Sequence, residues 1–161
     1  MQKLKLVPVA DIPKEIANCP EGDLKEIYRI CLLLSDLCTK ENGIGISASQ
    51  VGIPWKLYLI KSGSGHRYFL NCSYEGIGNK SDSLEGCLSL KKENGDLRYY
   101  FVKRFDKIKV IGKELLALDK LVITDINLEF INTDAIVHQH EIEHCFGILI
   151  SDIGVEYTVW R

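Results

Sequence analysis

The segment HQHEIEHCFG, residues 138–147, holds three of the chain's four histidines. On an α-helix each residue advances about 100°, so His140 and His144 lie about 40° apart on one face and can reach one metal ion. Glu141 lies about 60° beyond His144, which keeps it out of the ligand set but close enough to touch a water bound to the ion. This H-E-x-x-H arrangement is typical of metal-assisted hydrolysis.

A charged helix with solvated histidines is the plain alternative to a metal site. It is disfavoured because Ile136 and Val137 share the face of His140, and an imidazole on a partly buried face needs a partner. His138 falls roughly on the opposite side and is interpreted as a surface residue or as an outer support for the ligands. His66 follows a Gly/Ser-rich stretch and is interpreted as an exposed loop residue.

A catalytic metal site needs a third protein ligand and one open position for water. The spacing from His140 to Gly147 follows the start of the metzincin pattern, but Ile150 stands where that pattern has its third histidine. Asp152 and Glu156 are the remaining downstream carboxylates, in a short tail. We therefore expect the third ligand to come from upstream.

Two upstream segments carry residues suited to this chemistry. In EGCLS, residues 85–89, Cys87 follows a glycine in a turn-like setting, and its thiolate would complete a Cys, His, His ligand set. In GIGISASQVG, residues 43–52, a substrate could approach the backbone closely while the amide of Gln50 donates a hydrogen bond. Each segment alone is a weak signal, because a free cysteine usually lies in a core and the second segment also fits a helix-to-strand connection.

The elements that must position these residues are a helix, a run of strands and a second helix. Apolar residues at helical spacing predict the first helix over residues 23–39, closed by Gly43. The second helix is expected to begin at Asn132 or Thr133, either of which can cap it, and to end near Gly147. Short strands are predicted over residues 56–61, 67–72, 98–102, 107–111 and 121–126. This order predicts an α+β fold whose late helix packs on a mostly antiparallel sheet.

The composition of the chain fits one compact domain over residues 1–161, with 46% apolar and 26% charged residues. The net charge of −2 argues against direct nucleic-acid binding. No segment has the length and apolarity of a signal peptide or a membrane span, so we expect a cytoplasmic protein that binds no membrane. The six cysteines include no C-x-x-C pair and are expected to be mostly reduced, with Cys31 and Cys38 in the core.

Taken together, the three segments resemble the motifs of the peptide deformylases. GIGISASQ (residues 43–50), EGCLS (residues 85–89) and QHEIEH (residues 139–144) occur in the family's order and at similar separations. The resemblance covers most of the chain, from about residue 24 to about residue 152. This conjunction is far more specific than any single motif.

The resemblance implies mostly antiparallel sheets packed around the central metal-binding H-E-x-x-H helix. It also implies an enzyme that removes the formyl group from the N-terminal formylmethionine of nascent chains and releases formate. One divalent ion would be held by Cys87, His140 and His144. Iron(II) would be the native metal, and nickel, cobalt or zinc could replace it. The implied partners are N-formylmethionyl peptides, and we expect the chain to act as a monomer.

The resemblance also implies the catalytic roles. Glu141 would take a proton from the metal-activated water and later pass a proton to the departing amine. The side-chain amide of Gln50 and the backbone N–H of Leu88 would stabilise the oxyanion that forms on the formyl group.

The family's mode of holding the peptide implies a further set of residues. An apolar pocket for the methionine side chain would be lined by Ile44, Ile136 and Val137. The main chain around Gly45 and residues 87–89 would pair with the extended peptide as an added strand. The remaining residues expected near the peptide are Glu85, Gly86, Ser89 and Arg104. Glu85 and Arg104 are expected to form an ion pair or to contact the peptide, and not to take part in catalysis.

Several positions depart from the family pattern. Ser47 replaces the usual alanine and is expected to place a hydroxyl near the substrate loop. Glu143 and Cys145 replace the usual aspartate and leucine, and residues 91–103 lack the usual proline. The chain ends at Arg161 without the basic C-terminal helix through which bacterial members dock on the ribosome. Ribosome docking is therefore doubtful, and the chain resembles the minimal forms carried by some viruses of bacteria.

Two other functions remain open on the sequence alone. A zinc endopeptidase could use the same His140-Glu141-His144 helix with a third ligand other than Cys87. A non-catalytic metal-binding module would have a closed site with a fourth protein ligand, such as Cys145 or Glu141. The complete set of catalytic residues favours the deformylase.

Overall fold

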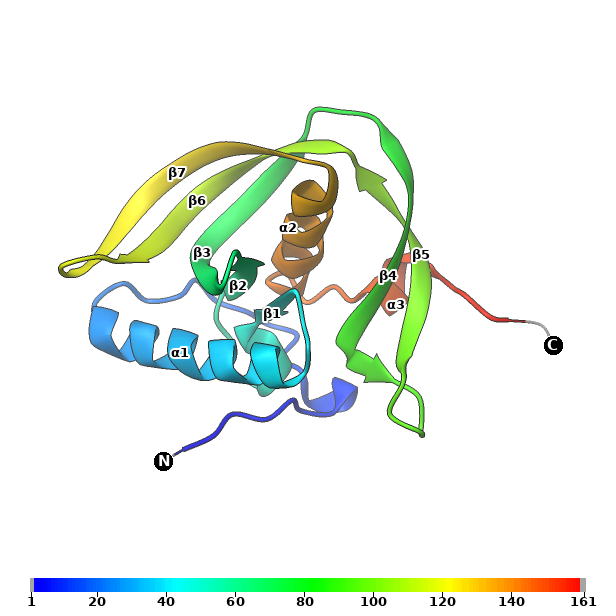
Figure 1. The fold of residues 1–161 in the computed structure, drawn as a ribbon, viewed down its shortest axis with the longest axis horizontal. Coiled ribbons are helices and arrows are strands. Elements are labelled where there is room, and N and C mark those ends of the chain that lie inside the picture. Colours follow the sequence, from blue (N-terminus) through cyan, green and yellow to red (C-terminus); the bar gives the residue numbers. More distant parts are fainter. Residues whose placement is uncertain (1, 160–161) are drawn as a thin grey trace.

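A computed structural model describes residues 2–159 of the chain, in which two β-sheets enclose the helix α2 (Figure 1). The larger sheet has the strand order β1-β2-β3-β6-β7 and the smaller one β4-β5-β8, with neighbouring strands antiparallel. The predicted α+β class with antiparallel sheets is confirmed. In the described part of the chain, no helix is both long and apolar enough to cross a membrane.

The elements have the following bounds. The strands are β1 (Gly45–Ser47), β2 (Leu57–Ser62), β3 (Gly65–Gly76), β4 (Lys80–Lys91), β5 (Leu97–Phe105), β6 (Lys107–Ala117), β7 (Leu121–Ile131) and β8 (Val155–Glu156). The α-helices are α1 (Leu24–Lys40), α2 (Asn132–His144) and α3 (Ile150–Ile153), and the 3₁₀ helices are η1 (Val9–Asp11) and η2 (Ala48–Val51).

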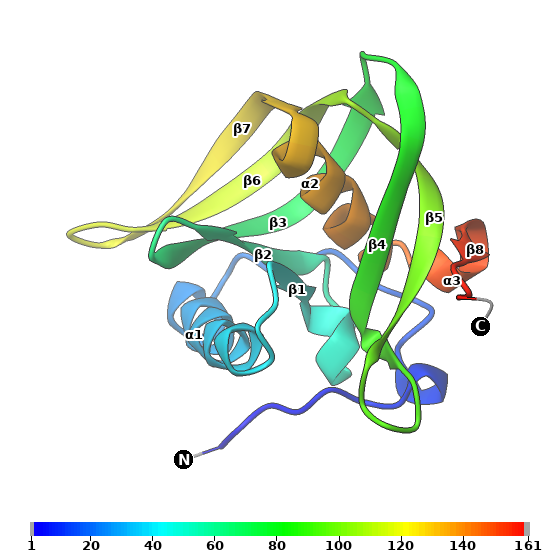
Figure 2. The ribbon, with the colours of Figure 1, turned by 45° about the vertical axis from the view of Figure 1, so that its right-hand side comes forward.

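The larger sheet is covered on both faces, by α1 on one side and by α2 on the other (Figure 2). Residues 57–60 of β2, with the sequence LYLI, are therefore all buried. Leu57 and Leu59 pack in the core that includes α1, whereas Tyr58 and Ile60 pack in the core that includes α2. A strand between two layers is apolar on both faces, which explains why this segment lacks alternation.

Helix α1 begins and ends within one residue of the prediction. Its N-cap residue Asp23 accepts a hydrogen bond from the backbone N–H of Glu26 at 3.0 Å. At the C-terminal end Asn42, with φ of 55°, takes the left-handed conformation that was expected of Gly43. The N–H of Gly43 then donates to the carbonyl of Cys38 at 2.8 Å, which completes a Schellman turn.

Helix α2 starts where it was predicted, but the predicted side-chain cap at Asn132 or Thr133 is wrong. The N-cap position is Ile131, which makes no side-chain cap bond. Instead, the N–H of Asn132 donates to the carbonyl of Asp106 at 2.8 Å, so the turn between β5 and β6 satisfies this end of the helix. The expected end near Gly147 is confirmed, because this glycine has φ of 74°.

Strand β4 is the main element that the sequence did not predict. Its sequence KSDSLEGCLSLK is rich in small and polar residues, which have low strand propensity, and only pairing with β5 makes it a strand. Cys87 therefore lies in a strand whose register shifts after Gly86, and not in a turn. His66 was wrongly interpreted as an exposed loop residue, since it lies half-buried in β3 opposite Lys61.

All six cysteines are free, as expected from their spacing. Cys31 and Cys38 are buried in the core between α1 and the larger sheet, which confirms the prediction for both.

Candidate active site

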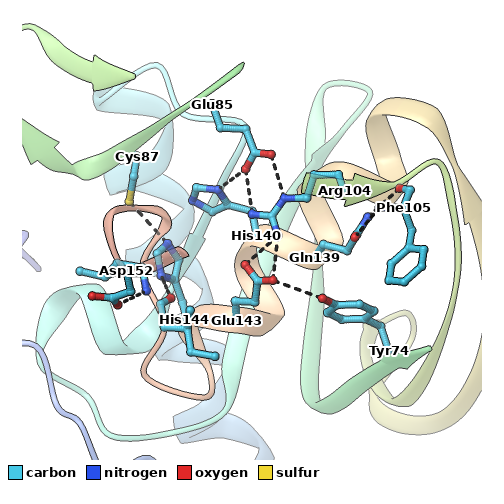
Figure 3. Close-up of polar contacts among 12 residues, drawn as sticks. Tyr74, Glu85, Cys87, Arg104, Phe105, Gln139, His140, Glu143, His144 and Asp152 are labelled. Carbon is cyan, nitrogen blue, oxygen red and sulfur yellow. Dashed lines mark hydrogen bonds and ion pairs between the residues drawn. The ribbon is translucent and has the colours of Figure 1, made fainter. Parts of the chain in front are cut away.

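Three side chains with metal-ligating atoms converge between α2 and β4 (Figure 3). Cys87 on β4 faces His140 and His144 on α2, and one ligand atom from each lies within 4.8 Å of the others. Sγ of Cys87 and Nε2 of His144 are 3.5 Å apart. The side chain of His140 is 11% exposed, and the other two residues are buried. A thiolate with two imidazoles is a donor set that suits zinc, iron, cobalt or nickel.

The other candidates for the third ligand do not join this group. The carboxylate of Asp152 accepts a hydrogen bond from the N–H of Leu149 at 2.8 Å and so caps α3. Glu156 is exposed in β8. Cys145 is buried in the core beneath the larger sheet, among residues such as Tyr58 and Phe69.

Both imidazoles are oriented through their Nδ1 atoms. Nδ1 of His140 donates to the carboxylate of Glu85 at 2.9 Å, and Nδ1 of His144 donates to the carbonyl of Ile148 at 3.2 Å. The second bond depends on the turn at Gly147, which brings Ile148 back over the helix end. With each Nδ1 occupied as a donor, Nε2 is left as the atom that can bind an ion.

A buried ionic network stands behind His140 (Figure 3). Arg104 is 2% exposed and donates to both oxygens of Glu85, at 2.8 and 2.9 Å, and to both oxygens of Glu143, at 2.7 Å. Glu143 also accepts a hydrogen bond from the hydroxyl of Tyr74 at 3.2 Å. Burial opposes the charge on Glu85, yet its bonds to His140 and Arg104 bring its pKa down to about 2. The expected ion pair between Glu85 and Arg104 is present, whereas Arg104 does not border the substrate pocket described below.

The charges of the group favour a thiolate at Cys87. Burial would raise the pKa of the Cys87 thiol, but His144 and His140 hold it well below its usual range. Burial would likewise lower the pKa of His140, but its contacts with Cys87 and Glu85 raise it. The thiolate is the form of cysteine that binds metal.

Glu141 occupies the wall of the same site without a partner of its own. It is 4% exposed, and its Oε2 has no hydrogen-bond partner among the described residues. Burial raises the pKa of this carboxyl. A side-chain Cβ at Gly45 would lie 2.9 Å from Oε1 of Glu141, so a residue with a side chain there would collide with it. A buried carboxylate left unpaired beside ligand atoms costs free energy and marks a functional position.

The amide of Gln50 is held at both ends. Its Oε1 accepts from the N–H of Ser47 at 3.0 Å, and its Nε2 donates to Oγ of Ser89 at 2.9 Å and lies 3.6 Å from Sγ of Cys87. The hydroxyl of Ser47 is fully buried and lies 2.9 Å from that of Ser49. The hydroxyl that Ser47 adds to the substrate loop points into this buried cluster, and Ser47 does not line the pocket described below.

A pocket of about 480 Å³ opens at the metal-ligating group and is lined by Cys87 and His140 of the three residues. Most of the residues predicted to bind substrate line it, namely Ile44, Gly45, Glu85, Gly86, Ile136 and Val137, together with Gln50, Leu88, His140 and Glu141. Ser89 and Arg104 do not. Leu97 and Tyr99 of β5 also line the pocket, and the sequence analysis missed both. Only the pairing of Gly86 with Tyr99, which depends on the unpredicted strand β4, brings them there.

His138 was predicted to be a surface residue or a support for the ligands, and it is neither. It is 2% exposed in the core, its ring stacks on Phe130, and the hydroxyl of Tyr58 donates to its Nδ1 at 2.8 Å. Burial, with a smaller contribution from Arg67, lowers the pKa of His138 to about 3. It is therefore a neutral core histidine, because the opposite face of α2 is covered by the larger sheet.

A family model described as polypeptide deformylase matches residues 2–156 of this chain. The chain belongs to the polypeptide deformylase family. Among its relatives, the peptide deformylase of Baumannia cicadellinicola is 31% identical over 92% of this chain and 87% of that protein. The peptide deformylase of Syntrophomonas wolfei is 29% identical over 97% of this chain and 98% of that protein.

Solved structures of deformylases have the same fold. The enzyme of Thermotoga maritima superposes with a TM-score of 0.79 at 21% identity, covering 95% of this chain and 98% of that one. A probable peptide deformylase from the Synechococcus phage S-SSM7 gives 0.78 at 24% identity, covering 94% and 99%. The family membership supports the metal-dependent deformylase function predicted from the sequence. It gives no support to the endopeptidase or to the non-catalytic metal-binding module.

Proposed function

We propose that this chain removes the N-formyl group from formylmethionyl nascent peptides in the cytoplasm, as one deformylase-like domain over residues 1–161 that acts as a monomer. One observation carries the proposal. The ligand atoms of Cys87, His140 and His144 lie within 4.8 Å of one another, and the unpartnered carboxylate of Glu141 lies in the wall of the same pocket. A hydrolytic metal site needs this combination of three ligands and a free acid–base group.

The side chains present fit one divalent ion, held by Sγ of Cys87 and by Nε2 of both histidines, with iron(II) as the native metal and zinc, nickel or cobalt as substitutes. The bound ion would supply Lewis-acid chemistry, which lowers the pKa of water and polarises a carbonyl group. The bonds from Nδ1 of His140 to Glu85 and from Nδ1 of His144 to Ile148 would hold the two rings for this task.

Glu141 would accept the proton of the attacking water and donate a proton to the departing amine. Two observations support this role: its burial, and the lack of a hydrogen-bond partner for its Oε2 within residues 2–159. Burial raises its pKa, and a carboxyl of raised pKa exchanges protons more readily near neutral pH. As the formyl carbon becomes tetrahedral, negative charge develops on its oxygen. The amide of Gln50 and the backbone N–H of Leu88 border the pocket and would donate to that oxygen.

The peptide would lie in the pocket between β1 and β4, both of which contribute lining residues together with α2. Strand β1 is an edge of the larger sheet, so its main chain around Gly45 has unpaired groups on one side. An extended peptide can pair with this edge and with residues 87–89, while Ile44, Ile136 and Val137 enclose the methionine side chain.

The reaction is tested by measuring free-amine and formate release from formyl-Met-Ala-Ser by protein loaded with nickel or, without oxygen, with iron(II). We expect stoichiometric release of both products from the formylated peptide. We expect no cleavage of an internal peptide bond in a longer, blocked peptide. Cleavage of the blocked peptide without formate release would contradict the proposal and favour a peptidase.

A further inference from the structure

The substrate pocket lies between two walls that belong to different sheets. One wall runs from Glu41 at the end of α1 to Gly45 of β1, and the other consists of residues 83–88 of β4. Strand β1 belongs to the larger sheet and β4 to the smaller one, so strand pairing within residues 2–159 does not join the two walls. The distance between the walls therefore depends on contacts made by side chains.

The part of β4 that would carry the catalytic groups is not held by β5. Up to Gly86 the two strands pair regularly, and the next paired residue of β4 is Lys91. The register shifts in between, so residues 87–90 have no ladder partner in the described part of the chain. This segment contains the ligand atom of Cys87 and the backbone N–H of Leu88. The position of both therefore depends on how firmly Lys91 is fixed.

Lys91 is fixed to the opposite wall by an ion pair. Its Nζ donates to Oε2 of Glu41 at 2.9 Å. The side chains of Lys91 and Glu41 are 34% and 26% exposed, so the pair is partly shielded from solvent. Glu41 is the C-cap of α1, where its N–H donates to the carbonyl of the buried Leu37 at 3.0 Å. Lys91 is thus attached to a helix that is packed in the core.

Two further contacts join the walls nearer the ligand atoms. Gln50 donates to Oγ of Ser89 at 2.9 Å. The backbone at Gly43 lies against the side chain of Leu88, since a Cβ at Gly43 would be 2.9 Å from Cδ1 of Leu88. Of the three contacts, the Glu41–Lys91 pair is the one that depends on charge, so changes of charge can test it without altering the lining of β4.

The spacing of the walls matters for a peptide that pairs with both of them. Hydrogen bonds from one extended chain to two walls can form together only at one separation, because each bond weakens steeply away from its ideal geometry. A wall that is fixed beforehand avoids the free-energy cost of ordering it on binding. Without the ion pair, peptide binding should weaken, whereas the bound peptide restores the spacing and the turnover of the complex is kept.

We propose that Glu41 and Lys91 are positioning residues that fix the width of the peptide-binding groove. This inference rests on the proposed function, because it takes the groove to hold a formylmethionyl peptide between β1 and β4. The two charges attract each other rather than the peptide, and they act on the reaction through residues 87–90.

The test uses formyl-Met-Ala-Ser amide, which carries no charge that either side chain could attract. KM and kcat are measured with metal-loaded protein at low salt. Lys91→Glu and Glu41→Lys each place like charges opposite one another and should raise KM by about five-fold, with kcat within about two-fold of wild type. The double variant Glu41→Lys/Lys91→Glu restores the attraction and should return KM to within about two-fold of wild type.

Lys92→Glu is the matched control. It makes the same change of charge one residue further along, at a side chain that forms no ion pair within residues 2–159, and it should leave KM unchanged. Salt provides a test on the wild-type protein itself. We expect 0.5 M NaCl to raise its KM by about two-fold and to have no such effect on Lys91→Met.

Three results would overturn the positioning role while leaving the deformylase activity intact: an unchanged KM in both single variants, a double variant as poor as the single ones, or an equal rise of KM in Lys92→Glu. Failure of metal-loaded wild-type protein to release formate from the peptide would instead reject the proposed function, and this inference with it.

Discussion

Gln50 illustrates how a single side chain is fixed before any substrate binds. Its oxygen is occupied by the N–H of Ser47, so the amide cannot flip without losing that bond. Its nitrogen carries two hydrogens, of which Ser89 accepts one. The second hydrogen is left for the side of Cys87 and the pocket, where the oxyanion would form.

Replacement of Ser89 by alanine should therefore lower kcat by about ten-fold. This factor corresponds to the free energy of one hydrogen bond, the one that holds the Gln50 amide in position. KM and metal content should not change, because the peptide is proposed to pair with the main chain of residues 87–89, which alanine retains, and Ser89 is not one of the ligands. Ser89→Thr keeps the hydroxyl and should restore kcat. Steady-state kinetics with metal analysis check this, and an unchanged kcat in the alanine variant would show that the bond does not position Gln50.

At the scale of elements, Arg104 joins the parts that carry the site. It lies on β5 and binds Glu85 of β4 and Glu143 of α2, and Tyr74 of β3 extends the network. The network around Arg104 thus connects both sheets and the central helix. Because the network is buried, its loss leaves charges without compensation.

Arg104→Met should lower the free energy of unfolding by about 3–5 kcal/mol, since two buried carboxylates would lose the guanidinium that compensates their charge and would keep only the bonds from His140 and Tyr74. Lys103→Met is a matched control: Lys103 also lies on β5 and pairs with a carboxylate of β4, that of Asp82, at 2.8 Å, but the two side chains are 68% and 60% exposed. That variant should cost about 1 kcal/mol or less. Urea denaturation of both variants measures the difference, and equal losses would contradict the special role of the buried network.

His138 should make the fold sensitive to acid. Its pKa is about 6.5 in the unfolded chain and is lowered to about 3 by burial in the fold. Between these values the unfolded state binds the extra proton, so stability is fully present above about pH 6.5 and falls as the pH drops toward 3.

Glutamine in place of His138 can still accept a hydrogen bond from Tyr58 but does not titrate. This substitution should reduce the change of the unfolding free energy with pH by up to about 1.4 kcal/mol per pH unit. The unfolding free energy of both proteins between pH 7 and pH 4 measures it. Parallel curves for wild type and variant would show that His138 does not titrate on unfolding.

At the scale of the molecule, the sequence predicted the ends of α1 and α2 and the residues that converge on the site. Helical spacing placed His140, His144 and Glu141, because a helix is a local structure with a fixed period. Strand β4 was missed because its small and polar residues form a strand only through long-range pairing with β5. For the same reason, the sequence did not predict that Tyr99 lines the pocket.

The surroundings of the α2 face that carries His138 could not be predicted from the sequence either. His138 was misread because periodicity shows which side chains share a face but not what covers that face. The larger sheet covers it, and a polar ring then becomes part of a core through its bond to Tyr58. The direction of the Ser47 hydroxyl depends in the same way on a cluster that only the folded chain assembles.

Metal binding should stabilise the whole fold, because its ligands come from β4 and α2, which are distant in the sequence. With free metal at about 100 times its Kd, the free energy of unfolding should increase by about 2.7 kcal/mol. This increase corresponds to a rise in Tm of about 5–10 °C for a chain of this size. Chelation should reverse the rise. Cys87→Ser should remove most of it, and an equal rise in that variant would place the ion elsewhere.

The central claim is that one ion held by Cys87, His140 and His144 acts together with Glu141 as the acid–base group. The most direct test measures metal per chain and turnover of formyl-Met-Ala-Ser on the same samples of wild type and Glu141→Gln. We predict one ion per chain in both proteins and a loss of turnover of at least about 100-fold in the variant. Wild-type turnover in Glu141→Gln, or no turnover in a wild-type sample that carries one ion per chain, would contradict the account.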